Sequence, residues 1–108
     1  MSDRVKRYLP VLKRIRRMGE RAKRQYVRKC DTEFVNCVSE CAKNVITGNV
    51  PLNGRQMTNL HRKRNDLRAL SKKKTSLRMK HKIIQKGGFL TTLLPPVLGV
   101  LGSLLFQN

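Results

Sequence analysis

The sequence predicts an all-α fold, a small bundle of three to four short amphipathic helices with an uncharged apolar C-terminal tail. Three observations lead to this prediction. Apolar residues recur every three to four positions over most of the chain, the period of an amphipathic helix. Residues typical of helix caps precede the periodic segments. The chain has 108 residues, which corresponds to one domain at most, and the scarcity of aromatic residues implies a thin core.

Charge divides the chain into four blocks. The 25 Lys and Arg against 6 Asp and Glu give a formal charge of +19. Residues 1–29 and 53–86 are strongly basic, residues 30–52 are weakly acidic, and residues 87–108 carry no charged side chain. We therefore expect a basic N-terminal helix or arm, a basic helical core over residues 30–86, and an apolar tail that contains Gly and Pro. Self-repulsion at this charge density opposes compaction, so a negatively charged partner is expected.

The first helix is expected over about residues 10–29, with residues 3–9 as a short turn or a kinked extension. Pro10 is compatible with a helix start, because its missing N–H is harmless in the first turn. The polar side of this helix is almost entirely Arg and Lys. Its apolar stripe consists of Val5, Tyr8, Leu9, Leu12, Ile15, Met18, Ala22 and Tyr26.

The second helix is expected to form the middle of the core. Asp31 is a good N-cap, and Glu33 in the first turn interacts favourably with the helix dipole. Gly48 marks the end, because only glycine takes the left-handed conformation without strain. The apolar stripe consists of Phe34, Val35, Val38, Cys41, Ala42, Val45 and Ile46.

Two more helices are expected before the tail. Asn53 followed three residues later by Gln56 resembles a capping box, which predicts a helix over about residues 53–70. Ser76 can cap a shorter helix that ends at Gly87 and Gly88. The apolar residues of these two helices are Met57, Leu60, Leu67, Leu70, Leu77, Ile83 and Ile84.

The tail is apolar over residues 89–106, which is at the short edge for a bilayer span. Pro95 and Pro96 interrupt this run, so a conventional transmembrane helix is not expected. Two alternatives remain open, a membrane-active or interface-seeking segment and a segment that folds back over the helices. The residues expected to contact membrane or capsid are Phe89, Leu90, Leu93, Leu94, Val97, Leu98, Leu101, Leu104, Leu105 and Phe106.

The basic blocks are typical of proteins that bind the phosphates of double-stranded DNA by releasing counterions, without reading the bases. A solvated helix face usually mixes charges of both signs, whereas these blocks are almost purely basic. No zinc-finger spacing, RNA-stacking motif or heptad zipper indicates sequence specificity. The expected DNA contacts are Arg14, Arg16, Arg17, Arg21, Lys23, Arg24, Arg28, Lys29, Arg62, Lys63, Arg64, Arg68, Lys72, Lys73, Lys74, Arg78, Lys80, Lys82 and Lys86.

The cysteines and histidines do not form a recognisable metal or catalytic motif. Three cysteines within 12 residues are not typical of a disulfide framework. They favour a protein of a reducing compartment, or of a virion assembled in one. Cys37 and Cys41 are one helical turn apart, but His61 and His81 are too far from each other for usual zinc spacing. Cys37 lies off the apolar stripe and is expected to be an exposed thiol. We expect no metal, no cofactor and no enzymatic activity.

Two stretches carry a resemblance to a known group of proteins. One is Gly48–Leu52 followed by the basic helix Asn59–Leu70, and the other is Lys72–Leu77 followed by Lys82–Leu90 and Leu94–Leu98. The chain resembles the small basic proteins of adintoviruses and Maverick/Polinton elements. These are similar to the adenovirus minor core protein X, the precursor of mu.

The resemblance covers roughly residues 31–105 and is tightest over 48–98, while the first 29 residues match nothing in that group. It implies a virion core or minor capsid component that neutralises packaged double-stranded DNA or tethers it to the shell. Such a protein would be found in the virion, and in the host nucleus during assembly. The basic positions within 55–86 and the tail after Gly88 carry over. Asn53-Gly54 departs from the Ser/Thr-Pro helix start that is frequent in the group.

Three functional hypotheses follow. The first is a DNA-condensing virion protein whose tail docks on a capsid protein or on other copies of the chain. The second is a membrane-active entry protein, in which the tail inserts at a bilayer surface and the basic helices are attracted to anionic lipid. The third is a cellular RNA-binding protein, which the uncharged tail disfavours.

Overall fold

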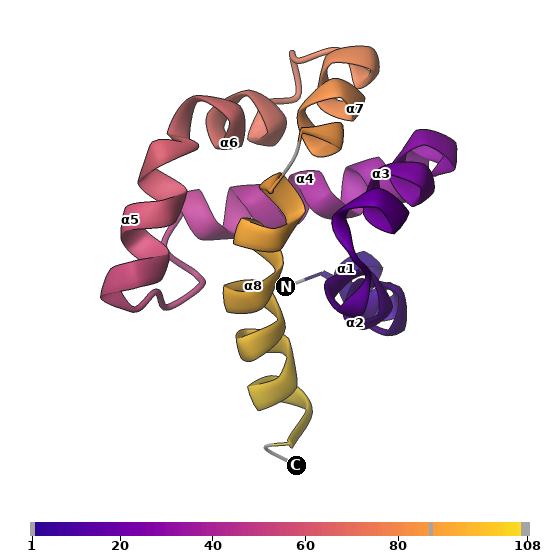
Figure 1. Ribbon diagram of the computed structural model, residues 1–108. Coiled ribbons are helices and arrows are strands. Elements are labelled where there is room, and N and C mark those ends of the chain that lie inside the picture. Colours follow the sequence, from indigo (N-terminus) through magenta and orange to yellow (C-terminus); the bar gives the residue numbers. More distant parts are fainter. Residues whose placement is uncertain (1, 87, 107–108) are drawn as a thin grey trace.

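The computed structural model describes residues 2–86 and 88–106, with side chains described as far as Leu101. Over these residues the chain forms eight helices and no strand, which confirms the all-α prediction and corrects the expected number of helices (Figure 1). The helices are α1 (Asp3–Arg7), α2 (Leu9–Arg17), α3 (Glu20–Lys29), α4 (Thr32–Ile46), α5 (Gly54–Arg62), α6 (Arg64–Ser71), α7 (Leu77–Gln85) and α8 (Phe89–Phe106).

The two ends of α4 form as the sequence predicts. The carboxylate of Asp31 accepts a hydrogen bond of 2.9 Å from the backbone N–H of Phe34. At the other end Gly48 has a φ of +83°. The backbone N–H of Asn49 then donates to the carbonyl of Asn44 at 2.9 Å, which closes a Schellman motif. Local hydrogen bonds therefore define both ends of this helix.

Helix α4 is the centre of the fold, because α1, α6, α7 and α8 all pack against it. Helix α8 crosses it and also contacts α2, α5 and α7. Figure 1 shows α3 and α5 at opposite ends of α4. The three segments expected from charge alone, an arm, a core and a tail, thus contribute to one continuous hydrophobic core.

The single first helix expected over residues 10–29 is a wrong prediction. Met18 and Gly19 adopt extended backbone, with ψ of 148° and 164°, and separate α2 from α3. Two extended residues rotate the following helix relative to the preceding one, so the apolar stripe does not continue in phase. As a result Ala22 is exposed, whereas Val27, which the stripe did not include, is buried.

The expected third helix is also divided. Asn53 and Gln56 form the predicted capping box, with hydrogen bonds of 2.8 and 3.1 Å. Lys63 then separates α5 from α6, and this bend lets α5 pack on α8 while α6 packs on α4. Besides Ala22, three residues expected on apolar stripes are exposed instead: Ile46, Met57 and Leu77.

Cys37 is fully buried, so the prediction of an exposed thiol is wrong. The prediction treated α4 as a helix with one covered face. In the structure four helices surround α4, and they also cover positions beside its main stripe. Cys41 is buried as well, and Cys30 is half-buried.

The tail forms α8 and folds back into the core. Pro95 and Pro96 lie within this helix and do not end it. No single helix in the described part of the chain is long and apolar enough to cross a membrane, although the bent pair α7 and Phe89–Leu101 meets that test by length and composition alone. The expected contact residues with described side chains are 6% exposed or less: Phe89, Leu90, Leu93, Leu94, Val97, Leu98 and Leu101. Leu104, Leu105 and Phe106 lie outside the described side chains.

A polar network attaches the first turn of α8 to the first turn of α3. Glu20 accepts hydrogen bonds from the Thr91 hydroxyl and, at 3.3 Å, from the backbone N–H of Gly88. Lys23 donates to Thr91 Oγ1 at 2.7 Å and lies 3.6 Å from Glu20. The hydrogen bond from Thr91 is the main cause that lowers the pKa of Glu20, followed by that from Gly88.

This network predicts an acid-dependent contribution to stability. A lowered pKa in the folded state stabilises the fold above the unfolded pKa of about 4.3, and this contribution is lost as the pH falls through the folded pKa. Glu20→Gln should therefore lower the melting temperature at pH 7, and the gap to wild type should narrow as the pH falls below about 4. Thermal unfolding followed by circular dichroism measures both values. The control is Asp3→Asn, which makes the same charge change at an exposed residue outside this network. A Glu20→Gln gap that is equal at pH 7 and pH 3 would contradict the assignment.

Candidate nucleic-acid interface

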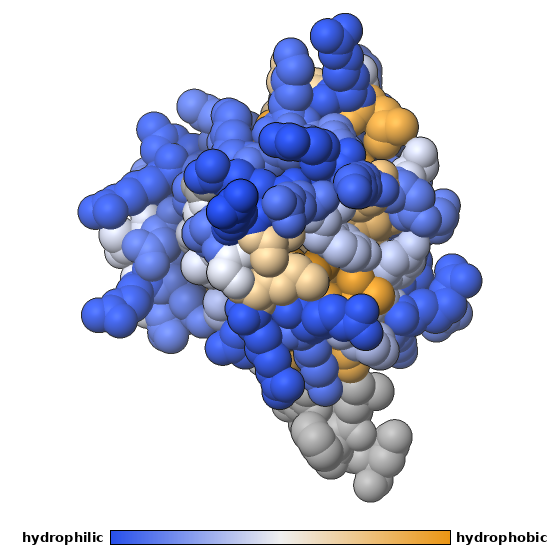
Figure 2. Space-filling view, turned by 45° about the vertical axis from the view of Figure 1, so that its right-hand side comes forward, coloured by the Kyte–Doolittle hydropathy of each residue, from blue (hydrophilic) through white to orange (hydrophobic). Residues whose placement is uncertain are grey.

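Most of the positive charge has no internal partner. Among the described residues, only Arg4, Lys23 and Lys86 of the 25 Lys and Arg form ion pairs, and the other 22 form none. The acidic residues are too few to neutralise more, and Asp31 already serves as a helix cap. Figure 2 shows hydrophilic side chains projecting over most of one face, with small apolar areas between them. This surface is available to an external anion.

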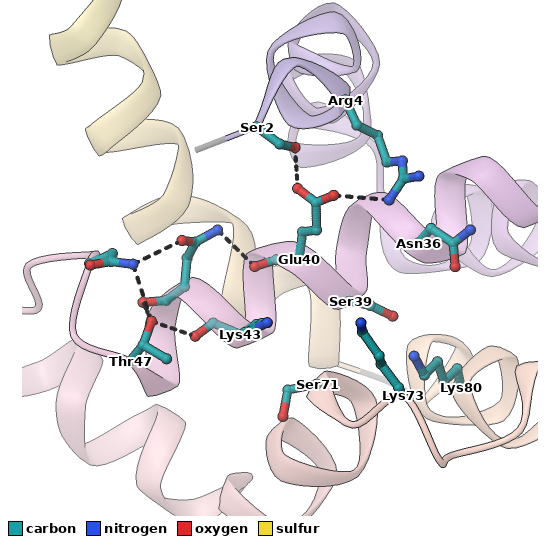
Figure 3. Close-up of a pocket in the computed structure, with 12 residues that line it drawn as sticks. Ser2, Arg4, Asn36, Ser39, Glu40, Lys43, Thr47, Ser71, Lys73 and Lys80 are labelled. Atoms are coloured by element: carbon teal, nitrogen blue, oxygen red, sulfur yellow. Dashed lines mark hydrogen bonds and ion pairs between the residues drawn. The ribbon is translucent and has the colours of Figure 1, made fainter.

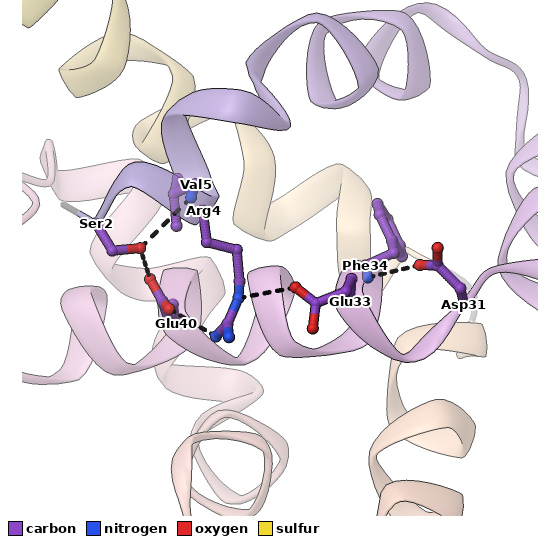
Figure 4. Close-up of polar contacts among 7 residues, drawn as sticks. All are labelled: Ser2, Arg4, Val5, Asp31, Glu33, Phe34 and Glu40. Atoms are coloured by element: carbon purple, nitrogen blue, oxygen red, sulfur yellow. Dashed lines mark hydrogen bonds and ion pairs between the residues drawn. The ribbon is translucent and has the colours of Figure 1, made fainter.

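The acidic residues of α4 hold the N-terminal segment in place (Figure 4). Arg4 pairs with Glu33 at 3.2 Å and with Glu40 at 2.9 Å. Ser2 caps α1 and also donates to Glu40. These contacts place α1 against the central helix. They do not reduce the charge of the basic helices that follow.

The first basic surface is formed by exposed side chains of α3. Arg21, Arg24 and Arg28 are spaced by three and four residues, so they share one side of the helix, and Lys29 lies at its end. Val27 of the same helix is buried, whereas the side chains of this row are exposed to solvent. Arginine suits phosphate because its planar guanidinium can donate two parallel hydrogen bonds. On α2, exposed cations extend the charge beyond this surface: Lys13, Arg14, Arg16 and Arg17.

The second basic surface lies on α5 and α6. It consists of Arg55 and Arg62 on α5 together with Arg64 and Arg68 on α6, and all four are exposed. Arg64 and Arg68 are one turn apart, so they project from the same side of α6. Further exposed cations lie in the turn after α6 and on α7: Lys72, Lys73, Lys74, Arg78 and Lys82.

Four of the predicted DNA contacts are placed differently from the others. Lys23 is 7% exposed and bound to Thr91, so it serves the core rather than the surface. Lys63 and Lys80 are half-buried, and Lys86 pairs with Asp66 at 2.9 Å. The remaining predicted residues are exposed. Lys23 therefore differs from the exposed position that the sequence predicted for it, because its ammonium bonds to a residue of α8.

The sulfur and imidazole groups do not form a metal site in the described part of the chain. Cys30 Sγ lies 3.4 Å from His81 Nε2, while His61 is exposed on α5. Burial raises the pKa of Cys30 to about 11. The hydrogen bond with Cys37, together with burial, raises the pKa of Cys41 well above its usual value. At neutral pH Cys30 and Cys41 are therefore protonated, the form in which a thiol is a poor nucleophile.

The described residues thus define a small all-α protein with a basic, largely unpaired surface around an apolar core. Comparison with protein-family models, curated proteins and solved structures finds no match for this chain.

Proposed function

We propose that this protein binds double-stranded DNA through the backbone phosphates, without sequence specificity, and condenses it. The observation that carries the proposal is the set of 22 Lys and Arg without an ion pair in the described structure. Bringing such side chains to a polyanion releases its condensed counterions, and this release drives non-specific binding. The hydrophobic core keeps these cations at fixed positions on a compact body.

The arrangement of the cations supports condensation in addition to binding. Helix α3, which carries the first basic surface, precedes α4, and α5, which carries part of the second, follows it. The two helices lie at opposite ends of α4, whose 15 residues extend over roughly 22 Å. A single duplex segment that contacts one surface leaves the other free to contact a second segment. A protein with charge at both ends can therefore hold two DNA segments together and offset the repulsion between them.

The resemblance to small basic virion proteins supports a more specific form of the proposal. In that form the protein is a core or minor capsid component, present in the virion and in the host nucleus during assembly. The apolar side chains of α8 up to Leu101 lie in the core. Contact of these side chains with a capsid protein or a membrane would therefore require α8 to leave its position. For this reason we assign DNA binding to the basic helices and no partner to the tail.

A salt series tests the proposal. Retention on a random-sequence duplex should fall by about three to five decades in affinity between 50 and 200 mM salt if 6–10 phosphates are contacted. Two duplexes of unrelated sequence should give the same affinity within a factor of about two, since phosphate contacts carry no direct sequence information. Absent or salt-insensitive binding would overturn the proposal. Preference for single-stranded RNA at equal salt would favour the cellular RNA-binding hypothesis instead.

A further inference from the structure

A polar groove runs along the side of α4 that the core does not use (Figure 3). It has a volume of about 670 Å³. One wall is α4, with Asn36, Ser39 and Lys43, and the opposite wall is the end of α6, the following turn and α7, with Ser71, Lys73 and Lys80. Its size is within the range of small-molecule sites in proteins.

Three lysine side chains line this groove. Lys43, Lys73 and Lys80 line it and form no ion pair within the described residues, and the carboxylate of Glu40 is already bound to Arg4. In Figure 3 the ammonium groups of Lys73 and Lys80 lie on the side of α4 that carries Ser39. Burial lowers the pKa of Lys80, which means that its ammonium has lost water without gaining an anion. A negatively charged ligand would offset this loss.

Ser39 provides an independent indication of a ligand. It is 9% exposed, and among the described atoms its hydroxyl has no hydrogen-bond partner. Buried hydroxyl groups almost always have a partner, because an unpaired one has lost its water without replacement. Asn36, one helical turn earlier, adds an amide that can donate to the same ligand.

We propose that the groove is a binding site for a phosphate group, with Ser39, Lys73 and Lys80 as its principal donors. A hydroxyl, an amide and two ammonium groups together match the several acceptor oxygens and the negative charge of a phosphate. The groove has room for the sugar or ester that carries the phosphate. The groove residues belong to neither of the two basic surfaces, although its lysines are among the 22 Lys and Arg without an ion pair in the described structure.

The test is a titration of the full chain with inorganic phosphate at constant ionic strength, in the absence of DNA. Backbone amide resonances of Asn36, Ser39 and Ser71 should shift and saturate. Lys73→Gln/Lys80→Gln should weaken binding at least tenfold. The matched control Lys72→Gln/Lys74→Gln removes the same charge at the two neighbours of Lys73, which do not line the groove, and should change the affinity less than twofold. Shifts that do not saturate, or equal weakening in both variants, would overturn the proposal.

Ser39→Ala keeps the test independent of folding defects in the lysine variant. Because its hydroxyl has no partner within the described residues, removing it should leave the melting temperature unchanged or higher and weaken phosphate binding several-fold. Unchanged phosphate affinity in Ser39→Ala would argue against the site. A duplex DNA titration then distinguishes the source of the phosphate. Shifts of the same amides assign it to the DNA backbone, and their absence assigns it to a free phosphate compound.

Discussion

Ending the chain at Gly88 is expected to abolish cooperative unfolding. This change removes seven apolar side chains of α8 that are 6% exposed or less. Burial of each contributes about 1.5–3 kcal/mol, or roughly 10–20 kcal/mol together. Even as an upper estimate, this is comparable to the entire stability of about 5–15 kcal/mol that small proteins have. Circular dichroism during heating should therefore show no sharp transition for the shortened chain.

A point substitution tests the same contribution more gently. Leu93 is fully buried, so Leu93→Ala should lower the free energy of unfolding by about 2–5 kcal/mol. Leu77→Ala removes the same atoms from an exposed site on α7 and should change it by no more than about 0.5 kcal/mol. Equal effects of the two substitutions, or an unchanged transition in the shortened chain, would show that α8 is not part of the core. The result also bears on the membrane hypothesis. If the shortened chain is unfolded, a liposome-leakage assay of the two chain lengths compares a folded protein with an unfolded one.

Neutralising one basic surface is expected to abolish condensation of DNA while binding persists. Arg21→Gln/Arg24→Gln/Arg28→Gln/Lys29→Gln removes four charges from the first surface and leaves the second unchanged. Each lost phosphate contact should reduce the slope of log affinity against log salt by about 0.9. The variant should still bind a duplex at low salt but should no longer hold two segments together. Light scattering of long DNA, measured at equal fractional saturation, reports this loss.

The second surface provides the reciprocal variant, with four substitutions to Gln at Arg55, Arg62, Arg64 and Arg68. A third variant with substitutions at Arg21, Arg24, Arg64 and Arg68 removes the same total charge but leaves two cations on each surface. We expect this divided variant to condense DNA better than either one-surface variant. Equal loss of condensation in all three would mean that net charge alone determines it and that the bridging geometry is wrong.

Helix caps and turns could be predicted because the atoms that form them are close in sequence. Asp31, the capping box at Asn53 and Gln56, and the left-handed Gly48 depend on hydrogen bonds to backbone groups a few residues away. The apolar period identified most core positions for a related reason, since residues three or four apart share a helix face. Ser76 likewise caps α7 as predicted.

Helix breaks and the burial of particular side chains could not be predicted in the same way. Met18 and Gly19 allow either a continuous helix or a break, and packing of α2 on α8 and α3 on α7 accompanies the break. The inward position of Lys23 involves its hydrogen bond to Thr91 of α8, which is distant in sequence. Cys37 is buried because four helices surround α4, which its local spacing does not indicate.

The sequence by itself determined the all-α class, the surplus of positive charge and the absence of charge in the tail, because these depend on composition and local period. Only the tertiary structure decided what the tail does, since residues 89–101 meet their apolar partners on helices distant in sequence. It also created the polar groove, which joins Ser39 to Lys73 and Lys80 across more than 30 positions of the chain. Apolar burial and long-range proximity depend on how helices pack, and packing is a property of the whole fold.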